Sequence, residues 1–245
     1  MLCIVASWTT ALGNGSVVIR ENVAAQRRHE LVSKLRSITG LTDLRFDEAG
    51  ILQLGQLHSN GSKEARVLIT QAVTGSKIVV IEDASSRADV AFCRVVPGRW
   101  RSGDEAKTPA FVVLIDFTDF KQISGDAQAR QSFDVGWGFL HELDHVIANS
   151  LDAEDPSLLG DCESHINTMR SELGLPLRVD YFFTEASVRT DPNFNNKLVR
   201  LRFESNDLEN SRKHRYWLVW DSNVVGGLVT TRQTAVVRSA ATRQK

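Results

Sequence analysis

The chain has 245 residues and a formal net charge of −1; 42% of its residues are hydrophobic and 24% are charged. These values are typical of an ordinary globular protein and predict one large domain, or one domain with an appended piece. Because the charge is balanced and no apolar run approaches the ~18 residues that span a bilayer, neither a nucleic-acid partner nor a membrane partner is expected.

The start of the chain and its cysteines bear on the compartment. The run from Met1 to Ala6 is apolar but lacks a positively charged n-region, so no clear signal peptide is predicted. Cys3, Cys93 and Cys162 are odd in number and form no C-x-x-C pair, which argues against a disulfide framework and against a cysteine-based zinc site. We expect a soluble protein, either cytoplasmic or a secreted effector.

The first half of the chain predicts strands alternating with helices. Apolar spacing predicts helices over Glu21–Ile38 and Lys63–Thr74, each followed by a glycine. The stretch Ser85–Asp104 is predicted to be irregular, with Pro97-Gly98 as a turn. Apolar and β-branched runs predict a first strand over 16–20, a hairpin of 44–46 with 51–54, and buried strands over 77–81 and 110–115.

The second half predicts two helices followed by strands. A polar connection over 118–131 leads to a helix over Phe133–Ser150, and Asp161 is a good N-cap for a second helix over Cys162–Leu173. Further strands are predicted over 179–183, 199–203 and 216–220, the last two as a hairpin. The basic tail 230–245 is predicted to be a frayed terminus rather than a binding arm.

The motif that carries chemistry is the segment from His141 to His145, which reads H-E-x-x-H within the first of these two helices. Positions four apart lie one above the other on a helix, so His141 and His145 can bind one zinc ion. Glu142 is then placed to hold the water that the metal activates. The motif also arises by chance on solvated helix faces, but here it lies among apolar residues, where unpaired histidines and a glutamate would be costly to bury.

A catalytic zinc needs a third protein ligand and one open position. Glu163, eighteen residues beyond His145, is the preferred third ligand because it lies in the first turn of the second helix. Asp161 and His165 are the alternatives. Asn167, four residues after Glu163 on the same face, is predicted to hydrogen-bond a ligand imidazole and fix its orientation.

The catalytic hypothesis gives the remaining side chains distinct roles. Glu142 accepts the proton of the metal-activated water and passes it to the leaving amine. A hydrogen-bond donor is needed to stabilise the oxyanion. Tyr181 is the preferred donor, Arg178 and His214 are alternatives, and Tyr181 is equally compatible with an ordinary half-buried position on a strand.

These residues resemble the zincin metallopeptidases, and the Glu163 and Asn167 pair is similar to the gluzincin branch of that family. The specific resemblance covers about Ala110–Phe183. It implies peptide-bond hydrolysis and a substrate that adds as a strand along Phe111–Ile115. The helical run 161–173 and its Gly-Leu-Pro-Leu-Arg ending are also similar to small bacterial effector and toxin peptidase domains.

The predicted fold is therefore α+β: a mixed sheet packed on helices, an H-E-x-x-H helix, a second ligand helix and a C-terminal hairpin. We expect a zincin-like domain over 1–195 with its core at 110–183, a hairpin extension over 196–229 that is packed on or part of the same domain, and the basic, flexible tail 230–245. The predicted function is a zinc-dependent metalloendopeptidase with a protein or peptide substrate. The alternative is a non-catalytic, metal-stabilised module that contacts a protein partner through the hairpin and tail.

Overall fold

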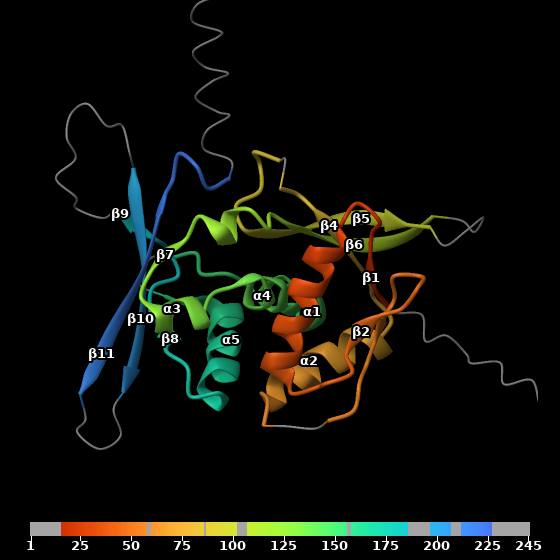
Figure 1. Cartoon of the computed structure of the whole chain (residues 1–245), viewed down its shortest axis with the longest axis horizontal. Coiled ribbons are helices and arrows are strands. Elements are labelled where there is room, and N and C mark those ends of the chain that lie inside the picture. The colour runs from red at the N-terminus through yellow and green to blue at the C-terminus, as the bar shows by residue number, and fades with distance from the viewer. Residues whose placement is uncertain are drawn as a thin grey trace, which may run out of the picture.

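A computed structural model describes residues 16–57, 60–85, 87–101, 107–155, 158–185, 197–206 and 212–226, and the statements below concern these residues. The fold is α+β, as predicted. One sheet lies over a layer of helices. A second sheet stands at one end of that layer, next to α3 and α5 (Figure 1). Within the described ranges, no helix is long and apolar enough to cross a membrane.

The first sheet contains four strands in the order β1-β4-β6-β5. β1 (Ser16–Ile19), β4 (Ile78–Asp83) and β6 (Thr108–Ile115) run parallel, and β5 (Cys93–Trp100) pairs antiparallel with β6. The buried side chains of the parallel strands explain why their sequences read as continuous apolar runs.

The strand β5 was not predicted, because Ser85–Asp104 was expected to be irregular. Pro97 and Gly98 lie inside β5, opposite Phe111 and Ala110 of β6, rather than at a turn. Proline is tolerated there because β5 is the edge strand of the described sheet. The strand β6 pairs on both sides, so the prediction that Phe111–Ile115 receives a substrate strand is wrong.

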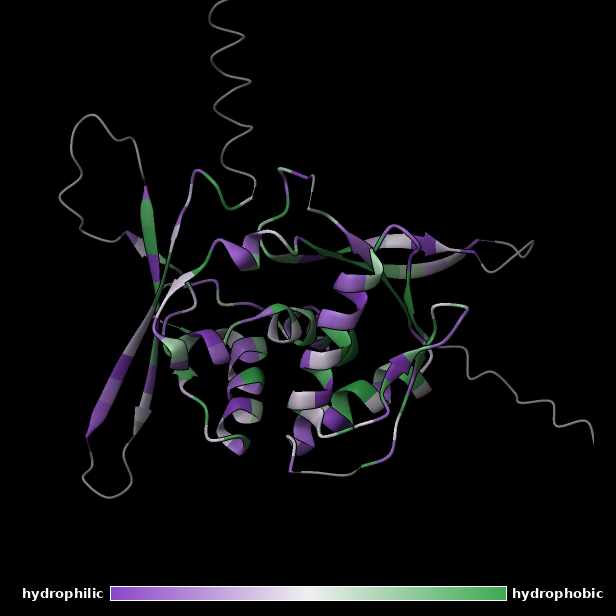
Figure 2. Ribbon diagram, viewed as in Figure 1, coloured by the Kyte–Doolittle hydropathy of each residue, from purple (hydrophilic) through white to green (hydrophobic). Residues whose placement is uncertain are grey.

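Four helices form the layer beneath this sheet: α1 (Ala25–Thr39), α2 (Lys63–Thr74), α4 (Val135–Ile147) and α5 (Gly160–Glu172). The helix α4 lies at the centre, where it packs against the other three helices and against β5 and β6. Apolar side chains of all four meet in one core, and Figure 2 shows their hydrophobic faces turned inward. A fully buried leucine or valine contributes about 1.5–3 kcal/mol, so this core holds α4 firmly.

Short elements connect these helices and strands. β2 (Arg45–Phe46) and β3 (Leu52–Gln53) form the predicted hairpin. The expected polar connection before α4 contains a 3-10 turn (Asp119–Lys121), β7 (Ser124–Gly125) and α3 (Ala127–Gln131).

The ends of α4 differ from the predicted ones for local reasons. Asp134 is the N-cap, since its Oδ1 accepts the backbone N–H groups of Gly136 (2.9 Å) and Trp137 (3.3 Å). Its other carboxylate oxygen lies 3.0 Å from Lys34 Nζ of α1. The chain leaves the helix at Asn149, whose φ of 57° is the left-handed conformation that ends a helix.

The second sheet is built on the predicted C-terminal hairpin. β10 (Leu198–Asn206) and β11 (Lys213–Asp221) pair antiparallel. Their register matches the predicted alternation, with Leu201 opposite Leu218. The expected strand at 179–183 is replaced by β8 (Leu177–Arg178) and β9 (Thr184–Glu185), which flank it and also pair with β10.

Because β7 pairs with β11 on the other side, this sheet joins chain segments from before α4 and after α5. The hairpin therefore shares one sheet with the preceding segments. The predicted tail 230–245 lies outside the described residues.

A buried arginine ties the second sheet to the helices. Arg170 of α5 is 2% exposed, and its guanidinium lies between the rings of Trp137 (5.2 Å) and Phe203 (5.6 Å). Its Nε donates to the Ser132 carbonyl at 2.9 Å, and its Nη1 pairs with the Glu163 carboxylate. Such a charge is tolerated in the interior because it is paired and hydrogen-bonded.

The cap on α4 gives a first prediction. Asp134→Ala should lower the free energy of unfolding by about 1 kcal/mol, because two backbone N–H groups lose their acceptor. Asp161→Ala is the matched control: this aspartate was expected to cap α5, but the N-cap position is Leu159 and no side chain caps that end. We expect a change of only a few tenths of a kcal/mol there, measured by urea unfolding. Equal losses in both variants would contradict the assignment of Asp134 as a cap.

The buried arginine gives a second prediction. Arg170→Met should lower the free energy of unfolding by about 3–5 kcal/mol, because Glu163 remains buried with less compensating charge. The control is Arg87→Met, which breaks an exposed pair with Asp89 (2.7 Å) and should change the free energy of unfolding little, because water screens the pair. Chemical denaturation of both variants measures the difference, and a similar small loss in each would refute the role given to Arg170.

Candidate metal site

The helix α4 presents both histidines of the motif on one face. The ring centroids of His141 and His145 lie 4.8 Å apart, and the rings are nearly perpendicular at 88°. Their side chains are only about one-sixth exposed, at 14% and 17%. The spacing of four residues therefore brings the two imidazoles together, as the sequence predicted.

The residue that meets both histidines is Asp152, in the loop between α4 and α5. Its Oδ1 lies 3.1 Å from Nε2 of His141 and 3.2 Å from Nε2 of His145. Ligands about 2.1 Å from a tetrahedral zinc lie roughly 3.4 Å from one another. The two distances from Asp152 to the histidines are therefore close to those expected between ligands of one ion.

The loop that carries Asp152 is fixed at both ends. The turn at Asn149 reverses the chain after α4, and Asp152 then forms a β-bridge with Gly160 at the start of α5. Gly160 has a φ of 77°, and a Cβ there would lie 2.5 Å from the Ala153 backbone nitrogen. Only glycine fits this close approach without strain.

The second nitrogen of each imidazole is also engaged. Nδ1 of His145 lies 2.9 Å from the Ser150 carbonyl oxygen, to which it can donate a hydrogen bond. Nδ1 of His141 lies 3.4 Å from Glu163 Oε2 and 3.4 Å from Cys162 Sγ. Such bonds on Nδ1 fix the ring orientation and leave Nε2 for a metal.

A fourth candidate ligand, Cys162, lies next to this group. One ligand atom from each of His141, His145, Asp152 and Cys162 can be chosen so that all lie within 4.8 Å of one another, and this cluster can hold a metal ion. The thiol is buried in the first turn of α5. At His141, its Sγ lies 3.4 Å from Nδ1 and 3.4 Å from the carbonyl oxygen, and the thiol also hydrogen-bonds with the imidazole of His145.

Glu163, the predicted third ligand, occupies a different position. It is fully buried, and its carboxylate pairs with Arg170 and with Arg178 Nη1 (2.8 Å). Burial would raise the pKa of Glu163, but the two guanidinium groups hold it well below its usual range. Glu163 reaches His141 from the Nδ1 side, so the geometry assigns it to orienting that ring and favours Asp152 as the third ligand.

The other residues considered for this role lie elsewhere. Asp161 is exposed in the first turn of α5. Nδ1 of His165 lies 2.6 Å from Oδ1 of the buried Asp144, on the other side of the helix pair. Asn167 bonds the backbone of Arg178 through both ends of its amide, at 2.7 and 2.9 Å, instead of a histidine. It braces β8 against α5.

Glu142 lies beside the histidines with its carboxylate fixed. Its Oε2 accepts the backbone N–H of Val95 in β5 at 2.8 Å. Burial raises the pKa of Glu142, although the neighbouring histidines act in the opposite direction. A cavity of about 540 Å³ opens over Glu142, both histidines and Asp152, with β5 along one wall.

Tyr181 reaches the same site from the segment after β8. Its ring stacks near that of His141, with centroids 6.3 Å apart, and its hydroxyl shares a hydrogen bond with Asp152. Burial and this bond raise the pKa of Tyr181. Of the alternatives, Arg178 is engaged with Glu163 and the carbonyl oxygens of Asp180 and Tyr181, and His214 is exposed on β11.

Asp152 is held as an anion by its neighbours. Burial would raise its pKa, but hydrogen bonds from His141 and His145 lower it below the usual range. The hydrogen bond with Asp152 is the largest cause that raises the pKa of His145, to about 11. A metal ion and protons therefore compete for the same imidazole nitrogens.

Comparison of the chain with protein-family models, curated proteins and solved structures found no match. The functional argument consequently depends on the geometry of the described residues.

Sequence reasoning missed Asp152, although a signal was present. A carboxylate seven residues after His145 can fold back onto a helix that ends between them, and Asn149 is a residue that readily adopts the left-handed turn required. The carboxylate on the second helix was preferred because its helical context was easier to predict than the path of a loop.

The site gives a third prediction. With zinc as the probe ion, Asp152→Ala should lower the affinity by at least about 100-fold, because the candidate ligand that meets both histidines is lost. Glu163→Gln should lower it about 10- to 100-fold through the orientation of His141. The matched control is Glu154→Ala, an exposed carboxylate in the same loop, with unchanged affinity. Competition with a chromophoric chelator measures all three. Loss of zinc in the Glu163 variant but not in the Asp152 variant would reverse the assignment of the two carboxylates.

Proposed function

We propose that this protein is a zinc-dependent metalloendopeptidase that hydrolyses peptide bonds in a protein or peptide substrate. The observation that carries the proposal is the meeting of two imidazole Nε2 atoms at one carboxylate oxygen, at 3.1 and 3.2 Å, on the floor of an open cavity. Glu142 lines the same cavity. The resemblance of the H-E-x-x-H segment to the zincins supports the choice of peptide bonds.

The donor set fits zinc. Two imidazoles and one carboxylate are ligands that catalytic zinc sites use, and the cavity leaves room for a fourth position. When bound, zinc would polarise a carbonyl group and lower the pKa of a water molecule toward neutrality.

Glu142 would serve as the general base. A carboxylate whose pKa is raised by burial is a better proton acceptor at neutral pH than one at its ordinary value. The hydrogen bond from Val95 holds one oxygen, so the other oxygen is left to accept the proton of the attacking water. The same carboxylic acid then donates that proton to the leaving amine.

Tyr181 would stabilise the oxyanion. Its hydroxyl already lies at Asp152, beside the ligand atoms, and its high pKa keeps it a hydrogen-bond donor at neutral pH. The contact between the Arg178 guanidinium and the Tyr181 ring, 4.9 Å from its centroid, supports the ring from behind.

The edge strand β5 would bind the substrate backbone. The side of β5 not paired to β6 passes Glu142, because the Val95 N–H points to that carboxylate. A peptide that pairs with this edge would run across the cavity, past the histidines. The proposed position of the substrate is therefore along β5 rather than along the strand that the sequence suggested.

A second function is favoured by one observation, the proximity of Cys162 to the ligand group. If its thiolate were a fourth ligand, the site would be closed, as structural zinc sites are. The protein would then be a non-catalytic, metal-stabilised module whose partner contacts the C-terminal hairpin and tail. The placement of Sγ on the Nδ1 side of His141 favours the open site.

The decisive variants are Glu142→Gln and Cys162→Ser. In a cleavage screen on a denatured proteome, the zinc-loaded parent should produce new termini that a chelator abolishes. Glu142→Gln should keep its zinc and lose at least about 1,000-fold of the activity. His141→Ala should lose the metal.

The Cys162→Ser variant separates the two functions. An open three-ligand site predicts full zinc content, and a cobalt-substituted parent should show no sulfur-to-cobalt charge-transfer band. A Glu142→Gln variant that cleaves as fast as the parent would contradict the proposed role of Glu142 as general base, and with it the peptidase mechanism. Loss of zinc from Cys162→Ser together with such a band would favour the structural site.

A further inference from the structure

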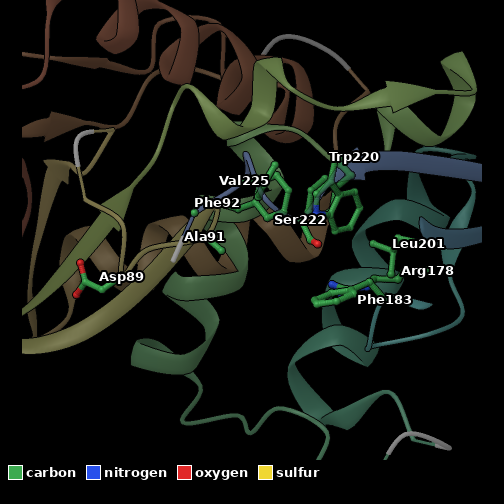
Figure 3. A pocket seen from close by; sticks show the side chains of 11 residues that line it. Asp89, Ala91, Phe92, Arg178, Phe183, Leu201, Trp220, Ser222 and Val225 are labelled. Atoms are coloured by element: carbon green, nitrogen blue, oxygen red, sulfur yellow. The ribbon is translucent and has the colours of Figure 1, made fainter. Parts of the chain in front are cut away.

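A second cavity lies between the two sheets, outside the metal site. Its volume is about 340 Å³, at the lower end of the range of roughly 300–1,000 Å³ that binds small ligands. Its lining is mainly apolar (Figure 3). Ala91, Phe92, Phe133, Phe183 and Trp220 are among the residues that line it.

Aromatic side chains form much of the wall. The ring of Phe92 meets those of Phe133 and Trp220 edge-on, with centroids 5.2 and 5.3 Å apart. Phe183 packs edge-on against Trp220 at 5.9 Å, although 52% of it is exposed. Walls of this kind suit an apolar guest and favour an aromatic one, which can add a further edge-to-face contact.

The apolar cavity leads toward the catalytic groups. A small cavity of about 110 Å³ shares Phe92 and Phe133 with it, and shares His141 and Glu142 with the cavity over the metal site. Phe92 directly precedes Cys93, where β5 begins. A peptide paired with β5 would therefore pass the apolar cavity where β5 begins, next to Phe92.

The backbone at this junction is held in an uncommon conformation. Phe92 has a φ of 61°, which is unfavourable for a phenylalanine and persists only where the surroundings impose it. Its N–H donates to Asp119 Oδ2 at 3.0 Å, and its carbonyl oxygen accepts from the Asp116 N–H at 2.7 Å. Asp119 also accepts the Gly226 N–H at 3.2 Å, so one buried carboxylate holds two parts of the cavity wall.

We propose that this apolar cavity binds a bulky apolar side chain, preferably aromatic, of the substrate peptide, and so determines cleavage specificity. The inference deepens the proposed function and rests on it. The strained Phe92 turns its ring into the cavity wall while the next residues line the metal site. Phe92 lines the apolar cavity and the next residue, Cys93, lines the cavity over the metal site, so the two cavities are adjacent along the chain.

The test uses full-length, zinc-loaded protein and two peptides that differ only by phenylalanine or alanine at the preferred position, found by profiling cleavage sites in a peptide library. The parent should show a kcat/KM at least about 10-fold higher for the phenylalanine peptide. Ala91→Trp, which fills the cavity from an exposed position, should reduce that ratio to within about twofold of one. Cleavage of the alanine peptide should change less than about twofold.

Two further variants sharpen the result. Phe183→Ala removes an exposed wall and should weaken the preference for phenylalanine without unfolding the protein. Ala24→Trp adds the same bulk at an exposed position before α1 and should leave the ratio unchanged.

The outcomes separate the two claims. Hydrolysis with no preference for bulky apolar side chains, or with a preference that Ala91→Trp leaves intact, would overturn the specificity cavity while the peptidase stands. Absence of hydrolysis of every peptide by the zinc-loaded parent would overturn the proposed function and this inference with it.

Discussion

The ion pairs of Glu163 with Arg170 and Arg178 are the interaction on which the site and the second sheet depend. One buried carboxylate compensates two guanidinium groups, and its geometry orients the imidazole of His141. Arg170 also contacts the ring of Phe203 in the core of the second sheet. Arg178 lies in β8 and contacts the ring of Tyr181. Because burying three such groups is costly unless each is paired, the position of every partner is tightly constrained.

Local patterns predicted the elements whose signals lie in consecutive residues. α2 begins and ends where its apolar spacing and glycine indicated, and the β10–β11 hairpin has the expected alternation of apolar side chains. The two histidines of α4 share a face for the same reason, since a spacing of four fixes their geometry whatever surrounds the helix.

The features that sequence reasoning missed are set by contacts between distant segments. β5 was read as irregular because Pro97 normally argues against a strand, and only its position at the sheet edge makes the proline harmless. Asn167 was expected to serve a histidine, but its amide matches the backbone of Arg178 in a strand that the sequence placed two residues later. Glu163 was preferred over a loop carboxylate as the third ligand, but its carboxylate pairs with Arg170 and Arg178. The sequence spacing does not show that these two arginines lie beside Glu163.

The composition of the second sheet bears on how the protein folds. Its strands come from before α4, from after α5 and from the C-terminal hairpin, and the pairing of β7 with β11 joins Ser124 to Val219, far apart in the chain. Folding of such non-local pairings is slow, because the entropy of closing long loops is lost before the contacts form. During synthesis, the Phe203 ring that covers Arg170 becomes available only after both helices of the site have been made. The candidate metal ligands are thus synthesised before the strands of the sheet that covers the buried charges of Arg170 and Glu163.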